Sequence, residues 1–389
     1  MTRSKYFLFS IFLFFITPLC FSQNADSITK YFLMDETNGF SVLEETSSSL
    51  VLYEQNYDVT IISKLENKES YNESKDYLVS MMEKLTNVYS YSPFEWNNKN
   101  CALATFEMTM DKDYTGMSLC VPTFDNQNYL LFLGYAPTSE KPLTQSIIMS
   151  CLNSICLDMS EFYTPGPIIS FTFASENEKL ISFNIGEDEI TSKLNEVDEE
   201  ASQFLIELEY NILKNQKYNN DQQKIESWRR YYRTIYRDNY ARVKNVIDDV
   251  LKYYYPNTMR PNKAEQIVFA QKILSWVQNF SYVRAETVNE SDFTSLPSVF
   301  CGKGNDCDSR SMMICAFMQT LDIECLLLIS PQFAHALAAL DINAPGQMFM
   351  FEDKNYLLGE TTAKVTWGTI VKEHADKSKW FPVYLNLFN

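Results

Sequence analysis

Histidine is scarce in this sequence, since His335 and His374 are the only two among 389 residues. There is no Cys-x-x-Cys pair and no histidine cluster at the spacing of a zinc site. The acidic clusters also lack the spacing of calcium ligands. We therefore expect neither a metal nor a cofactor. His374 lies in a charged stretch, which predicts a surface position.

Long basic stretches, internal repeats and low-complexity tracts are absent as well. The chain carries 33 Lys and Arg against 50 Asp and Glu, which gives a formal net charge of −17. Such a chain repels the phosphate backbone, so we expect no nucleic-acid partner. Apolar residues make up 46% of the chain, enough for sizeable cores.

The one long apolar run lies at the N-terminus. Two basic residues precede residues 6–19, which are almost wholly apolar, and small residues follow at the positions that signal peptidase reads. This predicts a signal peptide over residues 1–22, cleaved after Ser22. A membrane anchor is the alternative, but a span needs roughly 20 apolar residues. A lipoprotein cysteine at Cys20 is disfavoured by the large residue before it. We expect an exported protein, periplasmic or secreted, with no stable transmembrane span.

Nine cysteines are present, and eight remain once the signal is removed. Export permits disulfides, although an even count does not prove pairing. Cys101 and Cys120 flank a predicted turn, so they could face each other across two strands. Cys315 lies in an apolar helical stretch, which is typical of a buried free thiol.

Residues 23–187 predict an α+β domain. Apolar alternation indicates strands and helical spacing indicates helices. The predicted strands are 57–62, 101–110, 116–121 and 129–135, the helices are 72–85 and 146–155, and a closing hairpin is formed by 168–174 and 179–184. In the order of these elements the segment resembles the Mog1/PsbP-like modules, without a diagnostic motif.

Residues 188–258 are polar and predict a helical connector, broken at 215–221. Its first part, 189–214, is rich in acids and predicts a solvated helix face rather than a calcium site. The second part, from Trp228, interleaves aromatic residues with arginines, as nucleic-acid-binding surfaces do. Because the chain is acidic and exported, we favour an amphipathic helix whose tyrosines pack and whose arginines pair with the acidic helix.

Residues 259–389 carry the residues suited to chemistry. The predicted helices are 264–279 and 308–321, and the predicted strands are 324–329, 335–341, 347–351 and 356–359, with a turn at 353–355. Cys307 therefore stands just before a helix, where the N-terminal amides can stabilise a thiolate or an oxyanion. Taken alone it could be structural, as the partner of Cys301 in a disulfide.

His335 and Glu360 complete a candidate constellation with Cys307. A histidine can take a proton from a thiol and return it to a leaving amine. A buried carboxylate can hold the imidazole in one tautomer and stabilise its charged form. Either residue alone is more often structural, and only the three together predict catalysis.

Three segments carry a family resemblance: Gly-Asn-Asp-Cys-Asp-Ser-Arg-Ser at 304–311, Phe-Ala-His-Ala at 333–336 and Tyr-Leu-Leu-Gly-Glu-Thr-Thr at 356–362. They resemble the transglutaminase-like superfamily of cysteine peptidases over about residues 262–370. That family has a glycine shortly before its cysteine, Ser or Thr four residues after it, and a histidine at a strand start. Glu360 stands where an aspartate is usual.

The resemblance implies a papain-like core, with the helix of the nucleophile packed on an antiparallel sheet that carries the histidine and the acid. It implies acyl transfer through a thioester on Cys307, with a protein or peptide substrate, cell-wall peptide included. A second oxyanion donor is not evident, because Trp276 and Tyr282 read as core residues. Two alternatives stay open: a catalytically inactive binding or assembly protein of this fold at the cell envelope, and a protein-crosslinking acyltransferase.

Overall fold

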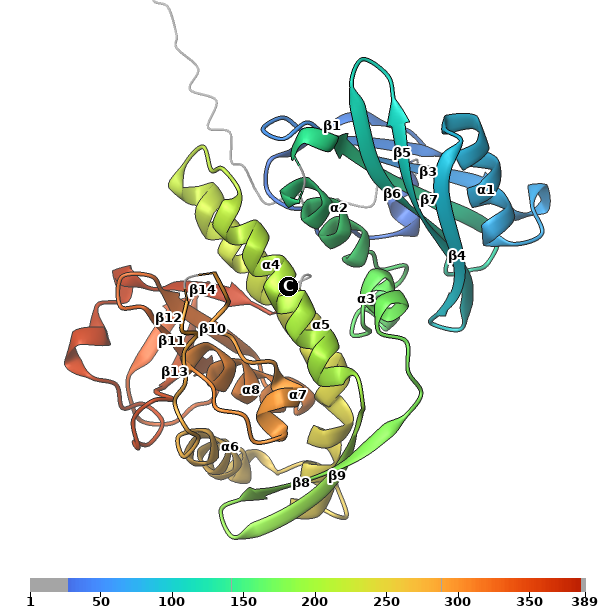
Figure 1. Ribbon diagram of the computed structural model, residues 1–389. Coiled ribbons are helices and arrows are strands. Elements are labelled where there is room, and N and C mark those ends of the chain that lie inside the picture. Colours follow the sequence, from blue (N-terminus) through green and yellow to red (C-terminus); the bar gives the residue numbers. More distant parts are fainter. Residues whose placement is uncertain (1–26, 141, 288, 386–389) are drawn as a thin grey trace, which may run out of the picture.

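The computed structural model describes residues 27–140, 142–287 and 289–385 (Figure 1). The predicted signal peptide, residues 1–22, lies outside the described residues. The architecture is α+β, as predicted: a seven-stranded antiparallel sheet, a helical middle region and a five-stranded sheet towards the C-terminus. Within the described ranges, no helix has the length and apolar character needed to cross a membrane.

The first sheet has the strand order β1-β2-β3-β7-β6-β5-β4. Its strands are β1 (Phe40–Glu45), β2 (Ser49–Glu54), β3 (Val59–Asn67), β4 (Val88–Trp96), β5 (Lys99–Thr109), β6 (Asp113–Pro122) and β7 (Asn128–Pro137). Helices α1 (Ser74–Leu85) and α2 (Leu143–Asn153) pack in two separate apolar cores on opposite faces of this sheet. The predicted strands and helices are confirmed here, while β1, β2 and β4 were not predicted.

Cys101 and Cys120 do not face each other across their two strands, so that prediction is wrong. Cys120 pairs in register with Ala102, so Cys101, one residue earlier, points to the other face of the sheet. Cys101 accordingly lies in the core shared with α2, and Cys120 in the core shared with α1. All eight cysteines of the described chain are free thiols, including buried Cys315 as predicted.

Only the second of the two strands predicted for the closing hairpin is a strand. Its first half folds as α3 (Pro167–Thr172), because Pro167 suits the first turn of a helix and Asn153 Oδ1 accepts the free N–H of Ile169. Its second half, β8 (Glu178–Ile185), pairs with β9 (Asp188–Asn195) through a tight turn at Gly186, whose φ is +68°. Helix was predicted for most of β9, but the alternating burial of this segment has the period of a strand.

Two helices, α4 (Asp198–Asn215) and α5 (Asp221–Tyr254), form the middle of the molecule, and α5 runs between the two sheets (Figure 1). The expected pairing of arginines with the acidic helix is confirmed. Arg230 Nη1 lies 2.6 Å from Glu209 Oε2, and Arg242 Nη1 lies 2.7 Å from Asp198 Oδ1. The predicted packing of the tyrosines is also found, for example at buried Tyr232.

The second sheet has the order β12-β13-β11-β10-β14, with antiparallel pairing throughout. Its strands are β10 (Cys325–Ser330), β11 (His335–Leu340), β12 (Met348–Phe351), β13 (Lys354–Gly359) and β14 (Phe381–Tyr384), and the neighbouring helices are α6 (Lys263–Val277), α7 (Leu296–Phe300) and α8 (Cys307–Thr320). All predicted elements of this region are present, and β14 and α7 are additional.

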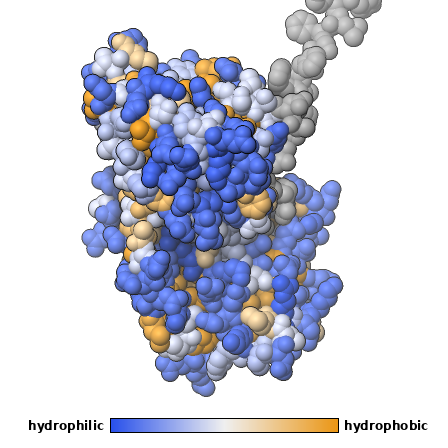
Figure 2. All heavy atoms as spheres, turned by 90° about the vertical axis from the view of Figure 1, so that its right-hand side faces the viewer, coloured by the Kyte–Doolittle hydropathy of each residue, from blue (hydrophilic) through white to orange (hydrophobic). Residues whose placement is uncertain are grey.

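Helix α8 is the central element of this C-terminal region. It packs on β10 and β11 on one side and on α5 and α6 on the other, so its residues are buried nearly all round. One apolar core joins α8, α5, α6 and the β8–β9 hairpin. This burial fixes the start of α8, and hence Cys307, against the first residues of β11. Outside the core, hydrophilic residues dominate the face shown in Figure 2, where apolar residues form only small separate groups.

Candidate active site

Cys307 is the first residue of α8, and its side chain is buried. The preceding Asp306 caps the helix by accepting the N–H of Ser309 at 3.1 Å. The approach to the helix is held by a short backbone bridge, in which Asn305 N donates to Ser281 O and Val283 N donates to Asn305 O, both at 3.1 Å. The loop before α8 thereby lies beside residues 281–283.

His335 and Glu360 come together at the start of β11 and the end of β13. The Nε2 atom of His335 lies 3.1 and 3.0 Å from the two carboxylate oxygens of Glu360. The register between Ala338 and Gly359 places these strand ends side by side. Thr362 fixes the carboxylate further, through its N–H at 2.8 Å and its hydroxyl at 2.6 Å. The second nitrogen of the ring, Nδ1, is not used by Glu360.

The Cys307 thiol lies beside the residue that follows His335. Its pKa is raised by burial, by the carboxyl of Asp308 and by that of Asp306, while the backbone N–H of Ala336 acts in the opposite direction. The Sγ atom lies 3.3 Å from Asp308 Oδ1. Among the described residues, no hydrogen bond joins this thiol to the ring of His335. The thiol is therefore protonated at neutral pH, and a nucleophilic role would require a base at the moment of attack.

Glu360 is electrostatically suited to pair with a charged imidazole. Burial raises the pKa of its carboxyl, but the hydrogen bond and charge of His335 and the two hydrogen bonds from Thr362 outweigh burial and bring this pKa to about 2. Glu360 is thus ionised at neutral pH although it is only 2% exposed. The longer side chain of glutamate still reaches His335, so the replacement of the usual aspartate does not separate acid and base.

Two residues that we did not single out from the sequence hold the nucleophile in place. Asp308 is half-buried, accepts the hydroxyl of Tyr232 from α5 and thereby ties α8 to the long helix. Arg310 is 2% exposed and donates to three acceptors on separate segments. They are Asn305 Oδ1 at 2.9 Å, Thr361 O at 3.2 Å and Phe280 O at 2.7 Å. The only sequence signal was their position within the cysteine segment.

Trp276 is a core residue as predicted, but the same prediction for Tyr282 is wrong. Tyr282 is 46% exposed, and its hydroxyl lies 4.0 Å from Cys307 Sγ. Arg284 Nε donates to that hydroxyl at 3.0 Å, and the guanidinium of Arg310 lies 5.2 Å from the centre of the ring. Alternation along the chain could not reveal this, because the bridge to Asn305 decides where the ring points.

His374 does not lie on an isolated surface stretch, contrary to our prediction. Its ring centre lies 4.8 Å from that of His335, and its Nδ1 lies 3.8 Å from Glu360 Oε2. It belongs to a short 3₁₀ turn, η5 (Lys372–Ala375), whose charged neighbours are exposed. Those neighbours suggested an exposed histidine, whereas the turn directs this one side chain inwards.

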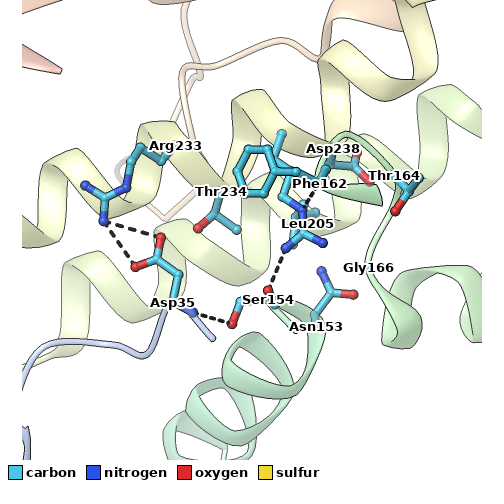
Figure 3. A pocket seen from close by; sticks show the side chains of 11 residues that line it. Asp35, Asn153, Ser154, Phe162, Thr164, Gly166, Leu205, Arg233, Thr234 and Asp238 are labelled. Atoms are coloured by element: carbon cyan, nitrogen blue, oxygen red, sulfur yellow. Dashed lines mark hydrogen bonds and ion pairs between the residues drawn. The ribbon is translucent and has the colours of Figure 1, made fainter. Parts of the chain in front are cut away.

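Two cavities of the described chain are lined by none of Cys307, His335 and Glu360. One of them, of about 20 Å³, lies between α5 and residues of the N-terminal region such as Asp35 and Asn153, and is drawn in Figure 3. At this cavity Arg233 pairs with Asp35 at 3.1 Å. Arg233 Nε and the hydroxyl of Thr234 have no partner there. This volume suits about one water molecule and is too small for a substrate.

Comparisons with known proteins give no assignment. No family model matches the chain, and no curated protein matches it. Among solved structures, the Ran-binding protein Mog1p of Saccharomyces cerevisiae matches with a TM-score of 0.26 and 9% identity, over 33% of this chain and 92% of that chain. A protein of Bacteroides thetaiotaomicron matches with a TM-score of 0.24 and 11% identity, over 55% of this chain and 75% of that chain. Likenesses at this level support no inference of function.

Proposed function

We propose that this protein is an exported, transglutaminase-like cysteine hydrolase that acts on amide bonds of a protein or peptide, cell-wall peptide included. The observation that carries the proposal is the hydrogen bond between His335 Nε2 and Glu360, with Cys307 at a helix start beside the same strand. This pairing leaves Nδ1 as the nitrogen that exchanges a proton with the thiol. The packing of α8 on the β10–β11 strands agrees with the papain-like core that the resemblance implies.

The proposed reaction begins with proton transfer from the Cys307 thiol to His335 Nδ1. The sulfur attacks the amide carbonyl carbon, and the resulting oxyanion forms near the N-terminus of α8. His335 then gives its proton to the leaving amine, and a thioester remains on Cys307. Water attacks the thioester as His335 takes its proton, which releases a carboxylic acid and restores the thiol. Glu360 stabilises the charged imidazole in both steps.

Tyr282 supplies the second oxyanion donor that the sequence did not identify. Its hydroxyl lies close to Cys307 Sγ, and the Nε–H of Arg284 donates to it. A phenol that accepts one hydrogen bond from a cation becomes a better donor to an anion. The Tyr282 O–H is thus suited to donate to the carbonyl oxygen as charge develops there.

A second candidate is a binding or assembly protein of this fold that lacks catalysis. It is favoured by the buried thiol with its raised pKa, and by the carboxyls of Asp306 and Asp308 beside it, which oppose a thiolate. A crosslinking acyltransferase would use the same thioester and differ only in the nucleophile that resolves it.

Iodoacetamide labelling, followed by intact mass, tests the proposal. A Cys301→Ser background removes the exposed thiol and leaves Cys307 as the candidate reactive site. We expect single labelling that Cys307→Ser abolishes and that His335→Gln slows by about 10²-fold or more, because general-base help is lost. Circular dichroism should show that both variants keep the fold. Labelling unchanged by His335→Gln would support the binding protein instead.

The reaction class needs a second assay, with a glutamine-containing peptide and an amine tag. Hydrolysis predicts release of ammonia without incorporation of the amine, whereas crosslinking predicts incorporation. Tyr282→Phe should lower the turnover of the peptide by about 10²-fold and leave iodoacetamide labelling nearly unchanged, because alkylation forms no oxyanion. Equal losses in both assays would show that Tyr282 acts on the thiol instead.

A further inference from the structure

Three potential metal ligands converge at the outer end of the His335–Glu360 pair. One donor atom each from His335, Glu360 and His374 lies within 4.8 Å of the other two. Nε2 of His335 lies 3.0 Å from Glu360 Oε2, and Nδ1 of His374 lies 3.8 Å from the same oxygen. The three residues come from β11, the end of β13 and η5, so the group exists only in the folded chain.

This donor set matches a known zinc chemistry. Two imidazole nitrogens and one carboxylate are a common set for zinc, with metal–ligand bonds of about 2.0–2.2 Å. Ligand atoms on one tetrahedral ion then lie about 3.4 Å apart. The two separations from Glu360 Oε2, 3.0 and 3.8 Å, lie on either side of that value, and the ion would replace the direct hydrogen bond between Nε2 and the carboxylate.

His374 has an unsatisfied nitrogen at this place. Its Nδ1 is buried from solvent and has no hydrogen-bond partner in the described chain. Buried polar atoms are nearly always paired, and an orphan atom indicates a missing partner such as an ion or water. The orphan nitrogen faces the Glu360 carboxylate, which is the direction that a shared cation requires.

The surrounding residues hold the ligands in place. Trp380 Nε1 donates to the backbone carbonyl of His374 at 3.0 Å, and the Trp380 ring lies 6.1 Å from that of His335. Phe333 packs 5.0 Å from the ring of His374. Thr362 orients the Glu360 carboxylate. Oriented ligands within an apolar wall are the usual environment of a bound metal.

We propose that His335, Glu360 and His374 bind a zinc ion, with water as the fourth ligand, and that this ion inhibits the cysteine chemistry. Zinc at Nε2 takes the lone pair of that nitrogen, so the single proton of the neutral ring moves from Nε2 to Nδ1. A protonated Nδ1 cannot accept the proton of the Cys307 thiol. The binding itself is independent of the proposed function, and the inhibition rests on it.

A second group, Asp306, Cys307 and Asp308, also brings donor atoms within 4.8 Å of one another. Its carboxylates accept hydrogen bonds from Ser309 and Tyr232, so binding there would compete with the cap of α8 and with its tie to α5. The experiment below separates the two groups.

Calorimetry with zinc, and visible absorption of added cobalt, test the site on the full chain after removal of metals by a chelator. We expect one equivalent to bind, with a tetrahedral cobalt spectrum. His374→Gln should weaken the affinity at least tenfold, whereas Cys307→Ser should leave it unchanged. Absence of saturable binding, binding indifferent to His374→Gln, or loss of binding in Cys307→Ser would each overturn the site.

Labelling of Cys307 tests the inhibition separately. In chelator, His374→Gln should be labelled as fast as the wild type, because His374 takes no part in the reaction. Zinc should slow labelling of the wild type at least tenfold and that of His374→Gln far less. Equal slowing in both would overturn the inhibition. A Cys307 that stays unreactive even in chelator would instead refute the proposed function, while calorimetry still decides the metal site.

Discussion

At the scale of single residues, the ionised carboxylate of Glu360 has a consequence for stability. Its pKa falls from an ordinary 4.5 to about 2 in the folded chain, so its contribution is complete above pH 4.5 and is lost as the pH falls towards 2. A shift of this size corresponds to about 3 kcal/mol at most. We expect Glu360→Gln to lower the free energy of unfolding at pH 7, and the difference from wild type to shrink between pH 4.5 and pH 2.

Urea unfolding at pH 7, 5 and 3 measures this difference. The exposed Glu373→Gln on the neighbouring turn is a matched control, and it should change the stability by less than about 0.5 kcal/mol at each pH. A Glu360→Gln difference that stays constant down to pH 3 would contradict the assignment of the low pKa to the pairing with His335.

At the scale of elements, Arg310 joins the start of α8 to the end of β13. Replacement by Met would remove the donor from two buried acceptors, on Asn305 and Thr361, and from a part-buried one, on Phe280. Each unsatisfied buried acceptor costs about 1–3 kcal/mol, so Arg310→Met should destabilise by about 2 kcal/mol or more. It should also slow labelling of Cys307, because Thr361 adjoins Glu360. Arg260→Met, which removes an exposed ion pair, should cost less than about 1 kcal/mol and leave labelling unchanged.

At the scale of the whole molecule, Arg230 on α5 connects the N-terminal unit to the helical layer. It contacts Glu209 Oε2 and Ser150 Oγ, both at 2.6 Å, and Asp35 O at 2.8 Å. Arg230→Met would leave Glu209 as an uncompensated buried charge, at a cost of about 3–5 kcal/mol in the free energy of unfolding. The double variant Arg230→Met with Glu209→Leu should regain most of this loss in urea unfolding. A double variant no more stable than the single one would show that the remaining hydrogen bonds, and not the charge pair, matter most.

Local patterns predicted most elements correctly, because helical and strand periodicities survive in the sequence. The failures have physical causes. Residues 168–174 form a short apolar run whose period does not distinguish a strand from a helix. The helix forms because Pro167 suits its first turn and Asn153 accepts the N–H of Ile169. The many polar residues of β9 hid its strand period in the sequence. In the folded chain alternate residues of β9 are buried, as in a strand. Short edge strands such as β14 depend on a distant partner, here β10.

The sequence by itself determined the order of Cys307, His335 and Glu360 and their places at a helix start and at strand ends, because chain position and periodicity are local properties. Only the tertiary structure decided that Glu360 meets His335, since that depends on the register of β11 and β13. It also decided that Tyr282 lies at the thiol and His374 beside the acid. These contacts depend on the bridge between Tyr282 and Asn305 and on the position of the η5 turn. Residue spacing along the chain does not encode either of them.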